Sequence, residues 1–425
     1  MAQLSWHSKK AAAPFPSTLR TEGILYPGGA GYPGALARHT LIHGDNLAVM
    51  SALLSRYEGR INLIYADPPF FTNRRYPARV GRGEDSRRPK DWQLAEGYPD
   101  DWDDLDAYLD MLYPRLILMH RLLSQTGTLY LHLDWHVNAY ARVLLDEIFG
   151  AERLLNEIVW VYHGPSPIRS AFNRKHDTIL VYTKSQDYTF NVDAVRQPYN
   201  TNTVKTFASS PRAGFGKVPD LARGKVPEDW WYFPVVARLH SERTGFPTQK
   251  PEGLLRRILL ASSNAGDLVA DFFAGSGTMA VVADREGRDF IASDATWRAV
   301  HTMCTRFAGA VSSPVALQSA QQPDAQPEPW DGSEYSEAIA LTPLGSELKV
   351  VLPSEMLADL DYWEVDPDWD EQLFRSAVQV TRPRKKGKIS GEILIPSIAG
   401  ERPVCIHFVN VIGERTIAVL TKPAN

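Results

Sequence analysis

The sequence predicts an α/β protein with a doubly wound, mostly parallel sheet, a loop-rich insertion and a small β-rich domain at the C-terminal end. Three observations predict this class. Residues 254–293 alternate between helix-like and strand-like segments, which is typical of parallel βαβ units. A glycine-rich turn, Gly275-Ser276-Gly277, directly follows one of the strand-like segments. Another apolar strand-like segment, at 61–65, runs into the consecutive prolines Pro68 and Pro69, which end it.

The individual elements follow in chain order from residue 39. A helix-like stretch over 46–57 precedes the strand at 61–65. Apolar residues at three- and four-residue spacing predict an amphipathic helix over 105–123, with Asp100, Asp101, Asp103 and Asp104 near its start. Further strands are expected at 127–133, 156–162, 178–183, 268–273 and 290–293, and further helices at 136–149, 254–262 and 278–285.

Composition divides the chain into domains. Residues 1–37 mix proline and glycine with scattered apolar residues, so we expect an irregular N-terminal extension. Residues 38–310 form the predicted α/β domain, in which an aperiodic insertion spans about 163–247. Serine, proline and glutamine predict a linker over 311–330. Short strand-like runs at 348–352, 389–395, 404–411 and 416–420 predict a β-rich domain over 331–425.

Bulk composition excludes several classes of protein. Hydrophobic residues at 44% and charged residues at 23% of 425 are globular values, which exclude a mostly disordered chain. No apolar run long enough for a membrane span and no secretory signal occur, so we expect no membrane partner and a cytoplasmic location. The only two cysteines, Cys304 and Cys405, predict no metal site. The net charge of −4 means that contact with nucleic acid must be local.

The glycine-rich turn indicates a nucleoside cleft. Glycines after a strand let the backbone pass close to a ligand that a Cβ atom would exclude. Asp294 follows Gly275 at about the 20-residue spacing at which a carboxylate on the next strand accepts hydrogen bonds from ribose hydroxyls. A third glycine and a P-loop lysine are missing, which disfavours a phosphate-binding loop. The alternative is a tight strand-to-helix turn without a ligand.

The segment Asp67-Pro68-Pro69-Phe70 is the more specific signal. Two successive prolines fix the backbone and remove two N–H donors, so the loop presents the Asp67 carboxylate and the Pro68 carbonyl as acceptors. Such a loop suits an NH2 group. Phe70 offers a flat face for a planar base, and base–aromatic stacking contributes about 1–3 kcal/mol. The alternative is a strand terminator with a capping aspartate.

Together these residues resemble the S-adenosylmethionine-dependent DNA amino-methyltransferases, which methylate the exocyclic nitrogen of adenine or cytosine. Asp67 to Phe70 is similar to the catalytic motif of that family, and Asp271 to Thr278 is similar to its cofactor motif. The catalytic motif comes first, as in the β-group, with the target-recognition region between the two motifs. Thr248-Gln249-Lys250-Pro251 resembles the motif for the cofactor carboxylate, and Gly44-Asp45-Asn46 resembles the N-terminal element near the cofactor adenine.

The resemblance implies S-adenosyl-L-methionine as cofactor, double-stranded DNA as substrate, base flipping as the mode of access, a restriction endonuclease as partner and a homodimer. Asp67 and the Pro68 carbonyl would accept the amino hydrogens of a flipped base that stacks on Phe70. The cofactor-binding residues that it implies are Asp45, Asn46, Lys250, Asp271, Phe272, Phe273, Gly275, Gly277, Thr278 and Asp294. Within this set, Lys250 is expected on the methionine carboxylate.

The target base and the substrate class stay open at this point. Methylation of cytosine C5 needs a cysteine nucleophile, commonly after proline, and neither cysteine follows a proline. Asp rather than Ser before the prolines resembles the adenine-specific enzymes, and cytosine N4 is the alternative. RNA, a protein amide, or a catalytically silent DNA-recognition subunit are further alternatives.

Two basic segments are candidates for contact with DNA phosphates. The first follows the catalytic motif directly. The second lies inside the insertion, which also holds Trp230 and Trp231. The predicted nucleic-acid-binding residues are Arg74, Arg75, Arg79, Arg82, Arg87, Arg88, Arg174 and Lys175.

Overall fold

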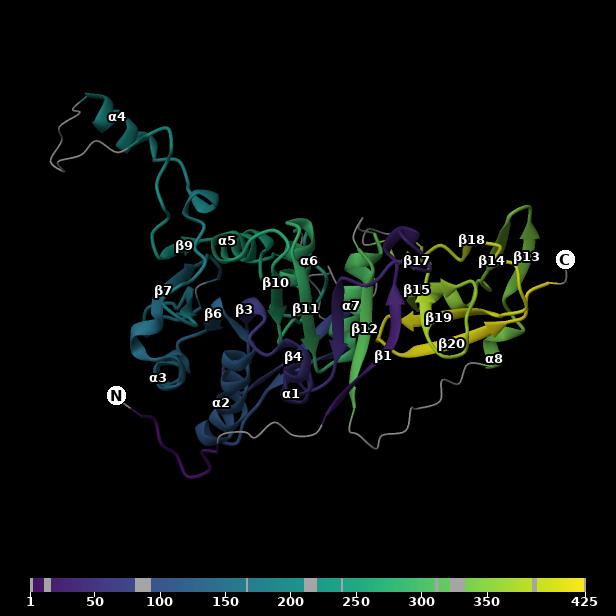
Figure 1. Ribbon diagram of the computed structural model, residues 1–425, viewed down its shortest axis with the longest axis horizontal. Coiled ribbons are helices and arrows are strands. Elements are labelled where there is room, and N and C mark those ends of the chain that lie inside the picture. The colour runs from purple at the N-terminus through teal and green to yellow at the C-terminus, as the bar shows by residue number, and fades with distance from the viewer. Residues whose placement is uncertain are drawn as a thin grey trace.

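The fold is an extended sheet covered by helices, with a smaller β-rich unit beside it (Figure 1). The computed structural model describes residues 3–10, 17–80, 93–165, 167–209, 220–237, 240–309, 313–321, 333–383 and 388–423. The predicted DNA contacts Arg82, Arg87 and Arg88 lie outside the described residues.

The large sheet has eleven described strands. Its six central strands, β12 to β6 in spatial order, all run parallel, which confirms the predicted doubly wound, mostly parallel α/β fold. In spatial order the strands are β16 (Phe374–Ser376), β1 (Thr18–Leu25), β12 (Val315–Gln321), β2 (His39–His43), β11 (Asp289–Asp294), β10 (Leu268–Asp271), β3 (Ile61–Ala66), β6 (Leu123–Leu133), β8 (His176–Thr183), β7 (Leu154–Val161) and β9 (Trp230–Tyr232).

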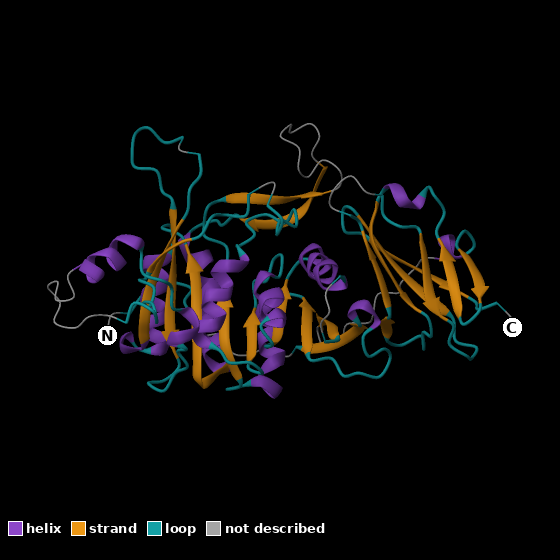
Figure 2. Cartoon of the chain, turned by 90° about the horizontal axis from the view of Figure 1, so that it is seen from above, coloured by secondary structure: helices purple, strands orange, loops and turns teal. Residues whose placement is uncertain are grey.

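Helices pack on both faces of this sheet (Figure 2), and alternate residues of the buried strands point to opposite faces. In β3, Ile64 packs into the core on one face, while Leu63 and Tyr65 pack into the core on the other face. The first core includes α1 (Asn46–Tyr57), α2 (Leu105–Leu122) and α3 (Asn138–Phe149). The second includes α5 (Glu252–Ser262), α6 (Thr278–Arg285) and α7 (Trp297–Ala308).

The strand order reverses direction at β3 and β10. From β3 the chain continues to β6 on one side, whereas β10 and β11 lie on the other side. The carboxyl ends are level with one another, since Asp271 pairs with Tyr65 of β3 and Asp294 pairs with His43 of β2. Ligands of doubly wound sheets bind beyond this edge at such a switch point.

Two predicted boundaries are wrong. Residues 1–37 were expected to be irregular, but Thr18–Leu25 form β1, which pairs with β12 and β16. Residues 311–330 were expected to be a linker, but Val315–Gln321 form β12, which lies between β1 and β2 inside the large sheet. Both strands are only partly buried, so polar residues interrupt the apolar pattern by which a strand is recognised.

An antiparallel hairpin that the sequence pattern does not predict follows the catalytic motif. It consists of β4 (Arg74–Val80) and β5 (Gln93–Asp100), which pair with each other. The insertion at 163–247 is loop-rich as expected, and it includes β8 and β9 of the large sheet and α4 (Thr201–Ser209). Among the described residues, no helix is long and apolar enough to cross a membrane.

The C-terminal unit, residues 333–423, is β-rich as predicted. Its own apolar core includes Trp363, Val365 and Ile406. β16 extends from it into the large sheet, so the two units share backbone hydrogen bonds. Its other elements are α8 (Ser333–Ser336), β13 (Ala340–Leu344), β14 (Glu347–Val351), β15 (Leu360–Asp366), β17 (Val378–Thr381), β18 (Glu392–Pro396), β19 (Val404–Asn410) and β20 (Arg415–Leu420).

Candidate active site

The catalytic motif forms the loop that leaves the carboxyl end of β3. Asp67 follows Ala66, the last residue of the strand. The hydroxyl of Tyr108, on α2, donates a 2.8 Å hydrogen bond to the carbonyl of Pro69, which anchors the loop to the helix. Because two prolines also restrict the backbone, the direction of the Asp67 side chain is well determined.

The two oxygens of Asp67 have different surroundings. Oδ2 forms an ion pair with Lys250 Nζ. The same nitrogen lies 5.4 Å from the centre of the Phe70 ring. Oδ1 is buried and accepts no hydrogen bond from any residue that the structure describes. His132 Nδ1 lies 3.8 Å from this oxygen. A buried carboxylate oxygen without a donor carries a free-energy cost, which a ligand donor would remove.

Asp100, the last residue of β5, holds the backbone that follows the motif. Its carboxylate accepts hydrogen bonds from three successive amides, those of Phe70 (3.1 Å), Phe71 (2.9 Å) and Thr72 (2.9 Å). It also accepts from the Thr72 hydroxyl at 2.6 Å and from the Trp102 indole at 2.8 Å. Asp100 is 1% exposed. The hairpin and the catalytic loop are therefore fastened together at one buried carboxylate.

The glycine-rich turn leaves β10, the neighbour of β3. Asp271 Oδ1 accepts a 3.0 Å hydrogen bond from the amide of Phe273. The Asn46 side-chain amide donates to the carbonyl of Phe272 at 2.7 Å, which ties the turn to the start of α1. Asp294, at the end of β11, accepts a 2.9 Å hydrogen bond from the Gly275 amide. The turn is thus held by Asp271 of its own strand, by Asp294 at the end of the neighbouring β11 and by Asn46 at the start of α1.

The two glycines of the turn have different roles. Gly275 lines the cavity at φ 50°, and a Cβ atom there would lie 3.1 Å from Phe246 Cε1. Gly277 has φ 72° and is absent from the cavity wall. A Cβ atom on Gly277 would lie 2.4 Å from Met303 Cγ on α7. The position of Gly277 therefore does not support the prediction that its backbone lets a ligand come close. The missing Cβ atom instead leaves room for Met303 of α7.

Asp45 and Asn46 begin α1 at the end of β2. Asp45 caps the helix, since its Oδ1 accepts from the amides of Leu47 (2.9 Å) and Ala48 (3.4 Å). Arg115, on α2, donates to Asp45 Oδ2 at 2.6 Å and also to Asn46 Oδ1. This network orders the strand end that forms one wall of the cavity.

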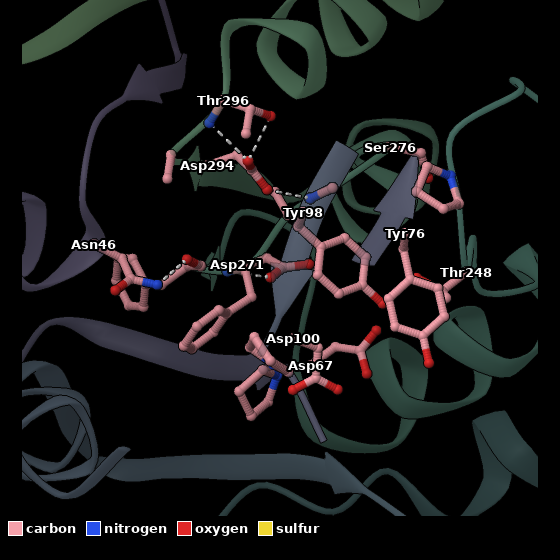
Figure 3. A pocket seen from close by; sticks show the side chains of 18 of the residues that line it. Asn46, Asp67, Tyr76, Tyr98, Asp100, Thr248, Asp271, Ser276, Asp294 and Thr296 are labelled. Atoms are coloured by element: carbon pink, nitrogen blue, oxygen red, sulfur yellow. Dashed lines mark hydrogen bonds between the residues drawn. The ribbon is translucent and has the colours of Figure 1, made fainter. Parts of the chain in front are cut away.

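One cavity of about 360 Å³ joins these loops (Figure 3). That volume lies in the range of small-molecule and cofactor sites. Of the predicted catalytic and cofactor residues, only Gly277 does not line it; those that do are Asp45, Asn46, Asp67, Pro68, Pro69, Phe70, Lys250, Asp271, Phe272, Phe273, Gly275, Thr278 and Asp294. Residues distant in sequence thus surround one space, with Asp67, Asp271 and Asp294 around it in Figure 3.

Burial perturbs two of these carboxyl groups. It raises the pKa of Asp271 well above the ordinary value, and the nearby charges of Asp67 and Asp294 raise it further. Burial also raises the pKa of Asp294, although hydrogen bonds from Thr296 and Gly275 oppose the shift. Perturbed carboxyl groups in a concave site are typical of a functional centre.

Several site residues escaped the sequence prediction. His132, in β6, is fully buried; its Nδ1 lies 2.8 Å from the Tyr65 hydroxyl and its Nε2 lies 3.3 Å from Asp177 Oδ2. A histidine inside an otherwise apolar strand is the signal that could have marked it. Tyr76 and Tyr98 of the hairpin stack with ring centroids 5.1 Å apart and also line the cavity.

The described candidates for DNA contact lie on β4 and in the loop that precedes β8. Arg74 and Arg75 are exposed on β4, and Arg79 is partly buried on the same strand. Arg174 lies at the same sheet edge as the catalytic loop, with its guanidinium carbon 4.1 Å from the centre of the half-exposed Trp135 ring. Lys175 next to it donates to the carbonyl of Pro165 at 2.6 Å.

The environment of both cysteines disfavours a thiolate nucleophile. Burial raises the pKa of the Cys304 thiol to about 12 and raises that of Cys405 as well. Neither side chain lines the cavity.

The two tryptophans of the insertion differ in exposure. Trp231 is buried, and its indole donates to the carbonyl of Glu228 at 2.8 Å, so its role is in packing. Trp230 is exposed.

Comparison with known proteins gives consistent matches. The profile of the DNA methylase family matches residues 61–304. The chain is 32% identical over 256 residues to the DNA adenine methyltransferase YhdJ of Escherichia coli strain K12, covering 59% of this chain and 76% of that protein. It is 29% identical to the type II methyltransferase M.HpaI of Haemophilus parainfluenzae, covering 58% and 67%. Among solved structures, it resembles a putative DNA modification methylase of Thermus thermophilus complexed with S-adenosyl-L-methionine, with 20% identity, a TM-score of 0.42 and coverage of 66% and 97%.

Proposed function

Because the chain belongs to the S-adenosylmethionine-dependent DNA amino-methyltransferases, we propose that its specific reaction is methylation of adenine N6 in double-stranded DNA. The observation that carries the proposal is the meeting of two loops in one cavity. The Asp67–Phe70 loop provides acceptors for an NH2 group, and the turn after β10 provides a nucleoside cleft beside it.

The cofactor side of the cavity fits S-adenosyl-L-methionine. Asp294 presents a carboxylate for ribose hydroxyls, and the backbone at Gly275 can approach a ligand because a Cβ atom is absent. Asp45 and Asn46 form the adjoining wall. When bound, the cofactor supplies an electrophilic methyl group on a sulfonium sulfur. Lys250 bonds to Asp67 here, so its assignment to the cofactor carboxylate remains a proposal.

The chain's own residues prepare the target amine. Asp67 Oδ1 is buried and has no donor among the described residues. The amine donates its two hydrogen bonds to Asp67 Oδ1 and to the Pro68 carbonyl. This raises electron density on the nitrogen, so catalysis relies on positioning and electrostatics rather than on a strong base. Phe70, which lines the same cavity, stacks on the flipped base and offsets part of the few kcal/mol that flipping costs.

Adenine is the preferred target for two reasons. Asp67 stands where adenine-specific members of the family carry aspartate, and the relative with 32% identity is described as an adenine methyltransferase. Cytosine N4 presents an NH2 of similar geometry and is the second candidate. The type II relatives make a cognate restriction endonuclease the partner to test for.

DNA is proposed to lie across the carboxyl edge of the sheet. Arg74, Arg75 and Arg79 on β4 and Arg174 and Lys175 before β8 would contact phosphates. The Trp135 ring, with Arg174 over it, adds an aromatic surface on this edge.

Methyl transfer by the Asp67→Ala variant tests the catalytic assignment. Radiolabelled methyl transfer to duplex DNA should fall by about 10²-fold or more, because an acceptor at the reacting nitrogen is lost. Cofactor affinity, measured by calorimetry, should stay within a few-fold of wild type. Retained methyl transfer would remove Asp67 from the mechanism. If the wild-type protein binds cofactor and DNA but transfers no methyl group, the result would support the alternative that it is a catalytically silent DNA-recognition subunit.

A further inference from the structure

The C-terminal unit contacts the catalytic unit behind the cofactor side of the cavity. Arg415, the first residue of β20, places its guanidinium carbon 3.9 Å from the centre of the Trp297 ring. Trp297 begins α7, and its ring stacks with His43 at 4.1 Å and an interplanar angle of 18°. Two groups at about 4 Å over one ring centre cannot share a face, so Trp297 is sandwiched between His43 and Arg415.

Arg415 is a well-held side chain rather than a mobile surface cation. It lines a small cavity of about 20 Å³ between the two units, together with Glu22 of β1 and Glu364 of β15. Burial lowers the pKa of Arg415, and the charges of Glu364 and Glu22 oppose that shift. Acidic side chains from both units thus lie around the same small cavity as the guanidinium group.

The other two members of the stack belong to the strand ends that form the cofactor site. His43 ends β2 and is followed by Gly44, whose amide donates to the Asp294 carbonyl at 3.0 Å. Ala295, which directly follows Asp294, lines the large cavity. Trp297 directly follows Thr296, whose amide and hydroxyl each donate to Asp294 Oδ1 at 3.0 Å.

The geometry points to the C-terminal unit as a support for the cofactor site, with Arg415 as a positioning residue. The Arg415 guanidinium packs on Trp297, whose ring stacks with His43, and the segments next to these two rings hold Asp294 through the Gly44 amide and through Thr296. This inference rests on the proposed function, since it concerns the binding of S-adenosyl-L-methionine. It assigns a role to a unit that lies outside the family match at 61–304.

Cofactor binding by full-length variants tests this role. Arg415→Met keeps an apolar stem and removes the cation, so Kd and KM for S-adenosyl-L-methionine should rise about 5-fold, within the range of a partly buried cation–π contact. The kcat at saturating cofactor and the KM for DNA should not change. Arg415→Lys keeps the charge and should give an intermediate Kd. Arg402→Met is the matched control, because Arg402 lies in the same unit and pairs with Asp368 at the surface.

The outcomes separate the two levels of the account. Wild-type cofactor affinity in folded Arg415→Met would overturn this inference and leave the proposed function standing. An equal rise of KM for DNA and for cofactor, together with a lower Tm, would mean a general structural role and would also overturn it. A wild-type protein that does not bind S-adenosyl-L-methionine would instead overturn the proposed function, and this inference with it.

Discussion

At the scale of single residues, the site depends on one predicted carboxylate and one that sequence reasoning misread. Asp67 stands in a short motif whose chemistry can be argued from two prolines and an acceptor. Asp100 begins a run of acidic residues that resembles the acidic first turn of a helix. Only Asp104 caps α2, by accepting from the Ala107 amide at 2.8 Å. Asp100 instead reaches back to the catalytic loop, a contact that no local pattern reveals.

Replacing Asp100 with asparagine should misplace the catalytic loop. Asparagine keeps the size but has one acceptor oxygen, so at least one of the three amides loses its partner at a cost of about 1–3 kcal/mol. We expect kcat to fall about 10-fold or more, since small displacements of reacting groups are costly, while the Kd for cofactor stays near wild type. Steady-state kinetics and calorimetry measure the two quantities. An unchanged kcat would show that the loop does not need this anchor.

Cofactor affinity should depend on pH through Asp294. An ionised carboxylate accepts hydrogen bonds from ribose hydroxyls, and burial raises the pKa of Asp294 above the ordinary carboxyl value of about 4. Affinity is therefore full above the raised pKa and is lost as the pH falls through it. Kd measured by calorimetry as a function of pH should rise as the pH falls through the raised pKa. Asp294→Asn should bind weakly at every pH, with residual dependence from Asp271, whose pKa is also raised. Parallel curves for both proteins would contradict the assignment.

At the scale of elements, buried periodic segments were predictable and partly exposed strands were not. β3, β10 and α2 carry apolar residues at strand or helix spacing because both faces of the sheet are covered. β1 and β12 are partly exposed, and their polar residues obscured the strand pattern. The β4–β5 hairpin was missed because arginines and a proline interrupt its first strand. The sequence thus predicted where the buried strands end, but not which side chains contact one another beyond those ends.

The two glycines of the turn provide a test at this scale. Gly277→Ala forces a Cβ atom to within 2.4 Å of Met303 at a positive φ, so the packing of α6 on α7 must shift. We expect the free energy of unfolding to fall by about 2 kcal/mol or more. Gly275→Ala meets the edge of Phe246 at 3.1 Å and should weaken cofactor binding more than stability. Denaturant unfolding and cofactor titration of both variants measure this difference, and the reverse ranking would contradict the two roles.

At the scale of the whole molecule, the chain has a net negative charge, but the basic residues proposed to contact DNA lie near the carboxyl edge of the large sheet. Arg174 over Trp135 lies at the carboxyl edge from which Asp67 also projects. If Arg174 neutralises a phosphate, Arg174→Ala should reduce the slope of log K for DNA against log salt by about one unit. Arg402→Ala, which changes a surface arginine of the C-terminal unit, should leave that slope unchanged. Equal slopes for wild type and Arg174→Ala would place DNA elsewhere.

The identity of the methylated nucleoside shows whether the Asp67 loop acts on adenine N6. Duplex DNA incubated with the protein and S-adenosyl-L-methionine is digested to nucleosides, and the modified nucleoside is identified by mass and chromatographic retention. We expect N6-methyl-deoxyadenosine from DNA treated with the wild-type protein and no methylated nucleoside from DNA treated with Asp67→Ala. N4-methylated deoxycytidine would keep the mechanism and change the base, whereas a ring-carbon product, or no methylated nucleoside from a protein that binds the cofactor, would contradict the account.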